Sequence, residues 1–189
     1  EKRVKSEDLP FLSNLMYSLN KANFKCPAPI VNNSNSTITN FDGKKLMIVS
    51  FLDGKAKSNL SPNNCKDIGI ETAKMHELTK NIKIKRQNDL SVNSWRSLFE
   101  TVKDQCSKLH KDLPKLIEES LNSVEKKWPK DLPKGIIHAD LFHDNIFFNK
   151  DKFSGIIDFY FSCEDFFAFE IAICFNALCF DGAKELSLI

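Results

Sequence analysis

The chain has 189 residues, 42% of them apolar, which is enough to bury a sizeable core in one domain, or in one domain and part of another. Its 27 basic and 25 acidic residues give a net charge of +2 and are spread along the sequence, so we expect neither a nucleic acid nor an anionic membrane as partner. No apolar run is long enough for a transmembrane helix, and we expect no signal peptide.

The cysteines predict buried free thiols in a cytoplasmic protein. None of the six forms a CxxC pair or lies beside closely spaced histidines, so the spacing of a zinc site is absent. Three of them stand in apolar surroundings near the C-terminus, as is usual for unpaired thiols in a reducing compartment. They are Cys26, Cys65, Cys106, Cys163, Cys174 and Cys179.

In chain order, the first third predicts a helix and then a hairpin. Over residues 8–24 apolar side chains recur with the helical period, and Pro27 and Pro29 end that pattern. Residues 37–41 and 45–51 then read as two strands. Between them stands Asp42-Gly43, a strong signal for a tight hairpin turn. A polar linker follows, and it places a break near residues 52–62.

The middle third predicts three helices. Apolar side chains follow the helical period around residues 68–79, 95–102 and 113–128. Pro114 suits the first turn of the last of these helices, and Pro129 suits its end.

The final third predicts small strands and one more helix. Residues 135–138, 146–148 and 153–158 are short apolar runs typical of strands, and residues 166–180 are apolar over the length of a buried helix. With the elements before them, these runs predict a mixed α+β fold.

One polar segment joins two of these strands, in the sequence GIIHADLFHDNIFF that begins at Gly135. Its pattern, His138-x-Asp140-x-x-x-x-Asn145, has the composition that phosphoryl transfer requires. An aspartate can accept the proton of an attacking hydroxyl, and an asparagine oxygen can bind Mg²⁺ without adding negative charge near a polyphosphate. Strands on both sides would fix the loop and present its side chains to a cleft.

A second metal ligand is expected on the next strand. In the sequence GIIDF, Asp158 ends an apolar run, and the length between Asn145 and Asp158 suits a hairpin that brings the two residues together. Bound Mg²⁺ there could bridge nucleotide phosphates. The alternative reading of the loop is a polar turn in which the aspartate is a cap and the asparagine is solvated.

With these motifs, the sequence resembles the homoserine kinases related to aminoglycoside phosphotransferases and choline kinases. The resemblance rests on HADLFHDNIFF and on SGIIDFYFSCEDFFAFEIAICFNALCF, and it extends upstream through EDLPFLSNLM, KCPAPI, IVSFLDG and SVNSWRSLFE. It implies a protein-kinase-like bilobal fold. Residues 1–52 would be a truncated small lobe, and residues 53–189 a mostly helical catalytic lobe.

The resemblance also implies residue roles. Asp140 would be the catalytic aspartate, with His138 shaping the catalytic loop, and Asn145 and Asp158 would hold magnesium. ATP would be bound with its adenine against the segment between the lobes. The residues implied for nucleotide binding are Ser50, Phe51, Leu52 and Ile157.

The implied reaction is ATP-dependent phosphorylation of L-homoserine in threonine biosynthesis, by a cytoplasmic enzyme that uses ATP and Mg²⁺. Two alternatives stay open: a related kinase acting on choline, an aminoglycoside or another amino alcohol, and a non-catalytic kinase-like binding module. The phosphate-covering hairpin and strand-borne lysine of such enzymes belong upstream of Glu1, so we assign activity to the intact protein.

Three residues depart from the family pattern. His143 stands where a proline is expected, Glu170 where an aspartate is usual before the Ala-Ile pair, and Leu178 where a tryptophan is usual. None of these positions belongs to the expected catalytic or metal-binding set.

Other polar residues have weaker functional readings. His76 is expected to be a packed, hydrogen-bonded histidine, and His110 a solvated one. Arg96 is a conceivable partner for an acceptor carboxylate, and Glu164 or Asp165 for an acceptor ammonium group. Phe159 and Phe161 are candidates for an acceptor pocket, and the basic run at residues 83–86 is not expected to bind nucleic acid.

Overall fold

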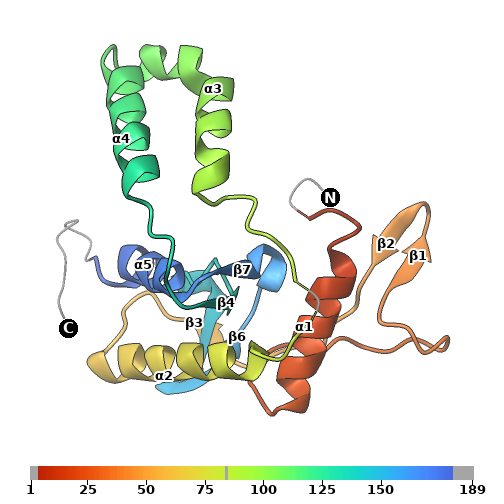
Figure 1. Ribbon diagram of the computed structural model, residues 1–189. Coiled ribbons are helices and arrows are strands. Elements are labelled where there is room, and N and C mark those ends of the chain that lie inside the picture. The colour runs from red at the N-terminus through yellow and green to blue at the C-terminus, as the bar shows by residue number, and fades with distance from the viewer. Residues whose placement is uncertain (1–3, 84, 181–189) are drawn as a thin grey trace. The chain divides into compact units, whose positions relative to one another are not determined.

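The computed structural model describes residues 4–83 and 85–180 (Figure 1). These residues form two compact units: one combines the described chain up to Gln87 with the described chain from Pro133 onwards, and the other is Asn88–Leu132. The first unit contains α1 (Leu9–Lys21), β1 (Thr39–Phe41), β2 (Lys44–Leu46), β3 (Lys55–Ala56), α2 (Pro62–Thr79), β4 (Lys134–Ile137), the 3₁₀ turn η1 (His143–Asn145), β5 (Ile146–Asn149), β6 (Lys152–Ile156), the 3₁₀ turn η2 (Phe159–Phe161), β7 (Cys163–Phe166) and α5 (Phe167–Leu178). The second contains α3 (Val92–Leu109) and α4 (Leu113–Lys127). The mixed α+β prediction is confirmed.

The first helix is confirmed, with narrower ends than predicted. Proline at its first turn suits α1, because the missing N–H would have had no partner in the helix. One face of α1 is buried and joins the main core. The helix stops where Asn23 takes a left-handed φ of 59° and the Phe24 N–H turns back to the Leu19 carbonyl.

The hairpin is also confirmed, but its second strand is shorter than predicted. Asp42 and Gly43 both have positive φ, as a tight hairpin turn requires. The strand expected to run to residue 51 instead ends at Leu46, and the prediction of residues 47–51 as strand was wrong. Beyond Leu46 the chain meets residues 28–30, where Pro29 forms only an isolated bridge with Val49. The ladder goes no further, because the Ala28 N–H donates to the Ser50 hydroxyl oxygen instead of to a backbone carbonyl.

The small strands form two separate sheets. In the first, β3, β5 and β6 lie side by side in that order and are antiparallel. In the second, β4 pairs with β7. The sequence did not predict β3, which has two exposed residues, or β7. It also assigned Phe166 to a helix, whereas Phe166 closes β7 and α5 begins at Phe167.

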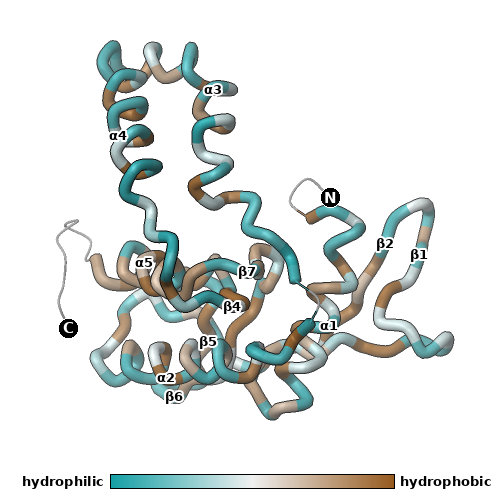
Figure 2. Tube along the Cα trace, in the orientation of Figure 1, coloured by the Kyte–Doolittle hydropathy of each residue, from teal (hydrophilic) through white to brown (hydrophobic). Residues whose placement is uncertain are grey.

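The final helix is less buried than its composition suggested. Figure 2 colours α5 mostly brown, yet Ile171 and Phe175 are exposed in the described chain. Within the main core, side chains from α1 and α2 pack with those of β5 and β6. The second unit has its own small cluster of Phe99, Cys106 and Leu121 between α3 and α4.

The prediction about the cysteines is confirmed in part. All six cysteines are free thiols, as predicted, but the prediction that they are buried was wrong for Cys65, Cys174 and Cys179, which are half-buried. Burial raises the pKa of Cys26 and of Cys174 to about 12, which is typical of unreactive structural thiols. Among the described residues, no helix has both the length and the apolar character needed to span a membrane.

The close approach of two backbones at Gly155 generates a stability prediction. Gly155 has a φ of 152°, and a Cβ added there would lie 2.5 Å from the Lys25 carbonyl oxygen. That oxygen also accepts the N–H of Ile156 at 3.0 Å, so it cannot move away without breaking this hydrogen bond.

We expect Gly155→Ala to lower the free energy of unfolding by about 2–4 kcal/mol, because backbone strain adds to steric overlap. Gly69→Ala is the matched control: Gly69 lies in α2 with nothing within 4 Å of the added Cβ, and alanine there is neutral or stabilising by up to about 1 kcal/mol. Urea denaturation measures both. Equal midpoints for the two variants would contradict the close-packing argument.

Candidate functional site

The buried ring of His138 lies at the base of the loop between β4 and β5. It is fully buried, and its Nε2 is 2.9 Å from the Ile157 carbonyl oxygen, so this nitrogen carries the proton and donates. Its Nδ1 accepts the Asp140 N–H at 3.3 Å. Burial lowers the pKa of this histidine, which favours the neutral ring. His138 therefore holds the loop backbone in place.

Asp140 and Asn145, the two functional side chains predicted on the loop, are joined directly. The Asn145 side-chain nitrogen donates to the Asp140 carbonyl oxygen at 2.8 Å and to its carboxylate Oδ2 at 2.9 Å. Because the amide nitrogen faces Asp140, the amide oxygen of Asn145 is the atom left to face a cation. The loop closes through Asn145 N–H, which donates to Phe142 O at 3.0 Å.

The Asp140 carboxyl is partly buried, and this burial raises its pKa above the ordinary aspartate value. The nearby Asp158 and Asp144 carboxylates raise it further, while His138 and the hydrogen bond from Asn145 oppose the rise. A carboxylate with a raised pKa is a stronger proton acceptor, so the raised pKa of Asp140 suits a group that takes a proton from a hydroxyl.

Asp158 follows β6 closely. The predicted hairpin is confirmed, since β5 and β6 pair from Ile146 with Ile156 onwards, and Ile157 N–H continues the ladder to Asn145 O at 2.9 Å. Asp158 itself lies just beyond the strand and is exposed. Its backbone is left-handed, with φ and ψ both 61°, a conformation that costs a non-glycine residue about 1–2 kcal/mol. Such strain clusters at functional sites.

The oxygen donors of Asn145 and Asp158 fit Mg²⁺ better than a transition metal. Hard cations take carboxylate and amide oxygens, and Mg²⁺ usually has one or two protein carboxylates with water and phosphate as its other ligands. No group of three or more His, Cys, Asp or Glu side chains able to hold a metal is present in residues 4–83 and 85–180. The donor set matches a cation that arrives with a phosphorylated ligand.

Glu170 supports the loop through a hydrogen bond to its backbone, a role that the sequence did not predict. Its side chain is fully buried. One carboxylate oxygen accepts the Ala139 N–H at 2.8 Å, and the other lies 2.7 Å from His76 Nε2. Ala139 has a left-handed φ of 64°, so Glu170 fixes a strained residue next to Asp140. The available signal was a lone charged residue inside the apolar stretch FAFEIAICF.

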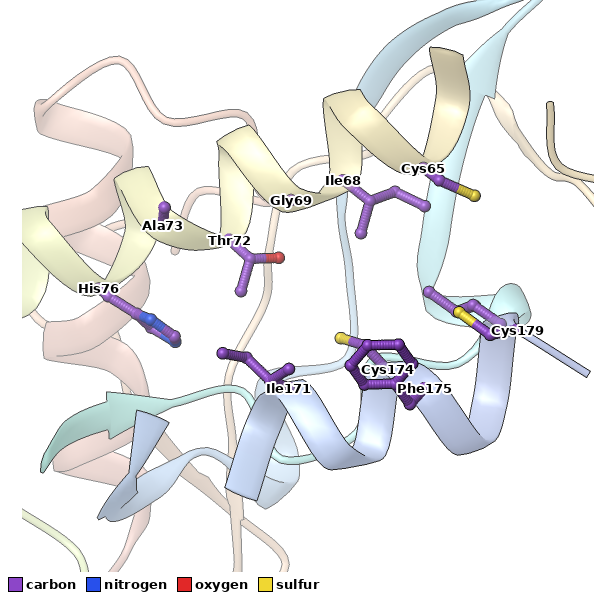
Figure 3. A pocket seen from close by; sticks show the side chains of 11 residues that line it. Cys65, Ile68, Gly69, Thr72, Ala73, His76, Ile171, Cys174, Phe175 and Cys179 are labelled. Carbon is purple, nitrogen blue, oxygen red and sulfur yellow. The ribbon is translucent and has the colours of Figure 1, made fainter. Parts of the chain in front are cut away.

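His76 links this carboxylate to α2, and its prediction as a packed, hydrogen-bonded histidine is confirmed. Its ring stacks on Phe167 with 4.2 Å between ring centroids. An apolar pocket of about 310 Å³ lies between α2 and α5. Figure 3 shows His76 at one end of it, with Ile171 and Phe175 on the opposite side. The histidine is therefore part of the packing between these two helices.

The segment expected to bind adenine is held by backbone pairing. Ser50 N–H donates to Ala28 O at 2.8 Å, and the Ser50 hydroxyl accepts the Ala28 N–H at 2.9 Å. Phe51 is exposed and Leu52 is half-buried. Both hydrogen-bonding groups used by Ser50 point to Ala28, so Ser50 positions the segment.

The residues considered for an acceptor have partners elsewhere. The Arg96 guanidinium forms a double hydrogen bond to Glu125 and a third to Asn122, all between α3 and α4. Glu164 is ion-paired with Lys85, and Asp165 accepts the N–H of Phe166 at 2.7 Å. These three side chains are engaged in holding the fold.

A model of the phosphotransferase enzyme family matches residues 1–187. The chain is 40% identical to the homoserine kinase of Rhizobium meliloti (strain 1021) over 99% of its own length and 58% of the relative's. It is 42% identical to the homoserine kinase of Methylorubrum populi over 96% and 57% of the two lengths. The chain thus spans somewhat more than half the length of these curated relatives. It belongs to the phosphotransferase enzyme family.

Solved structures with this fold share little sequence with the chain. An amicoumacin kinase in complex with AMP-PNP and Ca²⁺ aligns with a TM-score of 0.68 at 15% identity, over 93% of this chain and 54% of that one. A choline kinase from Cryptosporidium parvum aligns with a TM-score of 0.60 at 18% identity, over 93% and 52% of the two chains. At these identities the likeness establishes the fold.

The role of Glu170 yields a stability prediction. We expect Glu170→Ala to lower the free energy of unfolding by about 2–4 kcal/mol, because it empties a fully buried position and leaves the partly buried Ala139 N–H and His76 ring without their partner. Glu77→Ala is the control, since Glu77 is an exposed residue of the same helix as His76 and its loss should change stability by about 0.5 kcal/mol or less. Thermal or urea unfolding compares them, and similar losses for both would count against the support role.

Proposed function

We propose that the protein transfers the γ-phosphoryl group of ATP to the hydroxyl of L-homoserine. The observation that carries the proposal is the hydrogen-bonded pair Asp140–Asn145, with Asp158 one residue beyond the ladder that ends at Asn145. The homoserine kinases that match most of this chain at about 40% identity support the choice of acceptor.

The proposal includes a protein-kinase-like, two-lobed arrangement of the intact enzyme. Residues 1–52 would belong to the small lobe and residues 53–189 to the catalytic lobe. The fold likeness to the amicoumacin and choline kinases supports this. ATP would lie between the lobes, with its adenine against Phe51 and Leu52 and with Ile157 beneath it, while Ser50 fixes the segment.

In the proposed reaction, the Asp140 carboxylate orients the acceptor hydroxyl and takes its proton. The hydroxyl oxygen attacks the γ-phosphorus, the bond to the bridging oxygen breaks, and ADP leaves. Because the pKa of Asp140 is raised, activity falls as pH drops through that value and the carboxylate becomes protonated. Positioning and neutralisation of charge account for most of the rate in such reactions.

The amide oxygen of Asn145 and the carboxylate of Asp158 would hold Mg²⁺. When bound, this ion neutralises charge on the nucleotide phosphates. The hydrogen bonds from Asn145 to Asp140 keep the amide in the orientation that presents its oxygen. The left-handed backbone at Asp158 sets the direction of the second ligand.

The identity of the acceptor is tested by comparing L-homoserine with other hydroxyl compounds. We expect the intact protein with ATP and Mg²⁺ to phosphorylate L-homoserine, and to leave L-serine, choline and kanamycin largely unmodified. Asp140→Asn should lower kcat by about 10²–10⁴-fold without loss of folding, because it removes the proton acceptor. The control is Asp131→Asn, which removes one exposed carboxylate from the connection after α4.

ATP consumption and ³¹P NMR of the product measure these activities. Phosphorylation of choline or kanamycin in place of homoserine would reject the proposed acceptor and keep the site. Turnover of Asp140→Asn at the rate of the unsubstituted protein would reject the site itself.

A further inference from the structure

The middle of the catalytic loop is tied to a strand that sequence patterns did not predict. His143 is the first residue of η1, and its Nδ1 lies 3.1 Å from the carbonyl oxygen of Lys57, the residue that follows β3. A carbonyl oxygen can only accept a hydrogen bond, so Nδ1 must be the donor. The contact therefore requires a proton on Nδ1.

The backbone at Lys57 is held in place by contacts of its strand and of its side chain. The strand before it pairs with β5 through Lys55 and Ala56. Its ammonium group donates to Asn64 at 2.9 Å and is ion-paired with Asp151 at 2.6 Å. Asn64 is fully buried and completes the N-terminal cap of α2. The residue whose carbonyl accepts the His143 hydrogen bond is therefore held by β5, by α2 and by Asp151 in the turn between β5 and β6.

The other hydrogen bonds described above hold the loop near its two ends, and Leu141 between them is buried in the core. At the start, His138 accepts the Asp140 N–H. At the end, Asn145 is bound to Asp140 and, through its carbonyl, to Ile157. The residues on either side of His143, Phe142 and Asp144, are both exposed, whereas the His143 ring is half-buried. The His143 bond thus connects the turn that carries Asn145 to β3.

We propose that His143 is a positioning residue, which orients the turn carrying Asn145 by donating from Nδ1 to the Lys57 carbonyl. The inference rests on the proposed function, because it gives Asn145 the task of binding Mg²⁺ with the nucleotide. It assigns His143 no contact with substrate. The hydrogen bond acts through backbone geometry, as outer partners of metal ligands commonly do.

Two substitutions separate the hydrogen bond from the bulk of the ring. The amide nitrogen of asparagine occupies nearly the position of histidine Nδ1, so His143→Asn keeps a donor, while His143→Leu keeps an apolar side chain without one. In the intact protein we expect His143→Leu to raise the Mg²⁺ concentration for half-maximal ATP binding by about 10-fold, and His143→Asn to recover most of that difference. Isothermal titration of ATP at several Mg²⁺ concentrations measures both.

A direct measurement on the unsubstituted protein does not depend on activity or on variant folding. In ¹⁵N-histidine-labelled protein without metal or nucleotide, NMR should show the His143 ring protonated at Nδ1. A ring protonated only at Nε2 would overturn the proposal. So would titrations in which His143→Leu matches the unsubstituted protein, or in which both variants are impaired equally. If the unsubstituted protein neither binds ATP nor phosphorylates any acceptor, the proposed function fails. The NMR result still decides whether His143 donates to the Lys57 carbonyl.

Discussion

The site depends on the two hydrogen bonds that the buried imidazole of His138 makes with the backbone. One ring nitrogen binds the backbone of the loop at Asp140, and the other binds the backbone at Ile157, one residue before Asp158. Two chain segments that carry different functional groups are thereby fixed to one rigid ring. Because the ring is fully buried and its pKa is lowered, it stays neutral and keeps one donor and one acceptor, as this bridge requires.

Strained backbone on both sides of the bridge is held by surrounding contacts. Ala139 and Asp158 both have left-handed conformations, each of which is unfavourable for a residue with a Cβ. Glu170 fixes Ala139 through its N–H, and the ladder from Ile157 to Asn145 leads directly into Asp158. The surrounding packing offsets the strain and leaves Asp158 near enough to Asp140 for its carboxylate to add to the rise that burial causes in the pKa of Asp140.

Local sequence patterns predicted those parts of the molecule that local chemistry decides. The helical period predicted α1 and Asp42-Gly43 predicted the hairpin turn, and both are confirmed. The polar residues between apolar runs indicated Asp140, Asn145 and Asp158, whose roles stay predictions. The patterns missed β3 and β7, because two exposed residues have no periodicity and the sequence CEDF has no apolar alternation that distinguishes a strand from a loop. The strand expected to end at residue 51 was too long, because the Ala28 N–H pairs with the Ser50 side chain and ends the ladder there.

The other features that the sequence did not predict depend on hydrogen bonds between residues far apart in the chain. Glu170 meets Ala139 and His76, and His143 meets Lys57, only after the chain has folded. No spacing rule in one sequence connects those pairs. A buried glutamate in an apolar helix signals that a partner must exist, but it does not say which residue the partner is.

The central claim is that Asn145 and Asp158 form a magnesium-dependent nucleotide site beside Asp140. The most direct test is calorimetric titration of ATP into the intact protein, with and without Mg²⁺, for the unsubstituted chain and for Asp158→Ala. We expect tighter ATP binding with Mg²⁺ in the unsubstituted protein, and loss of that magnesium dependence in Asp158→Ala. Equal enhancement by Mg²⁺ in both proteins would contradict it.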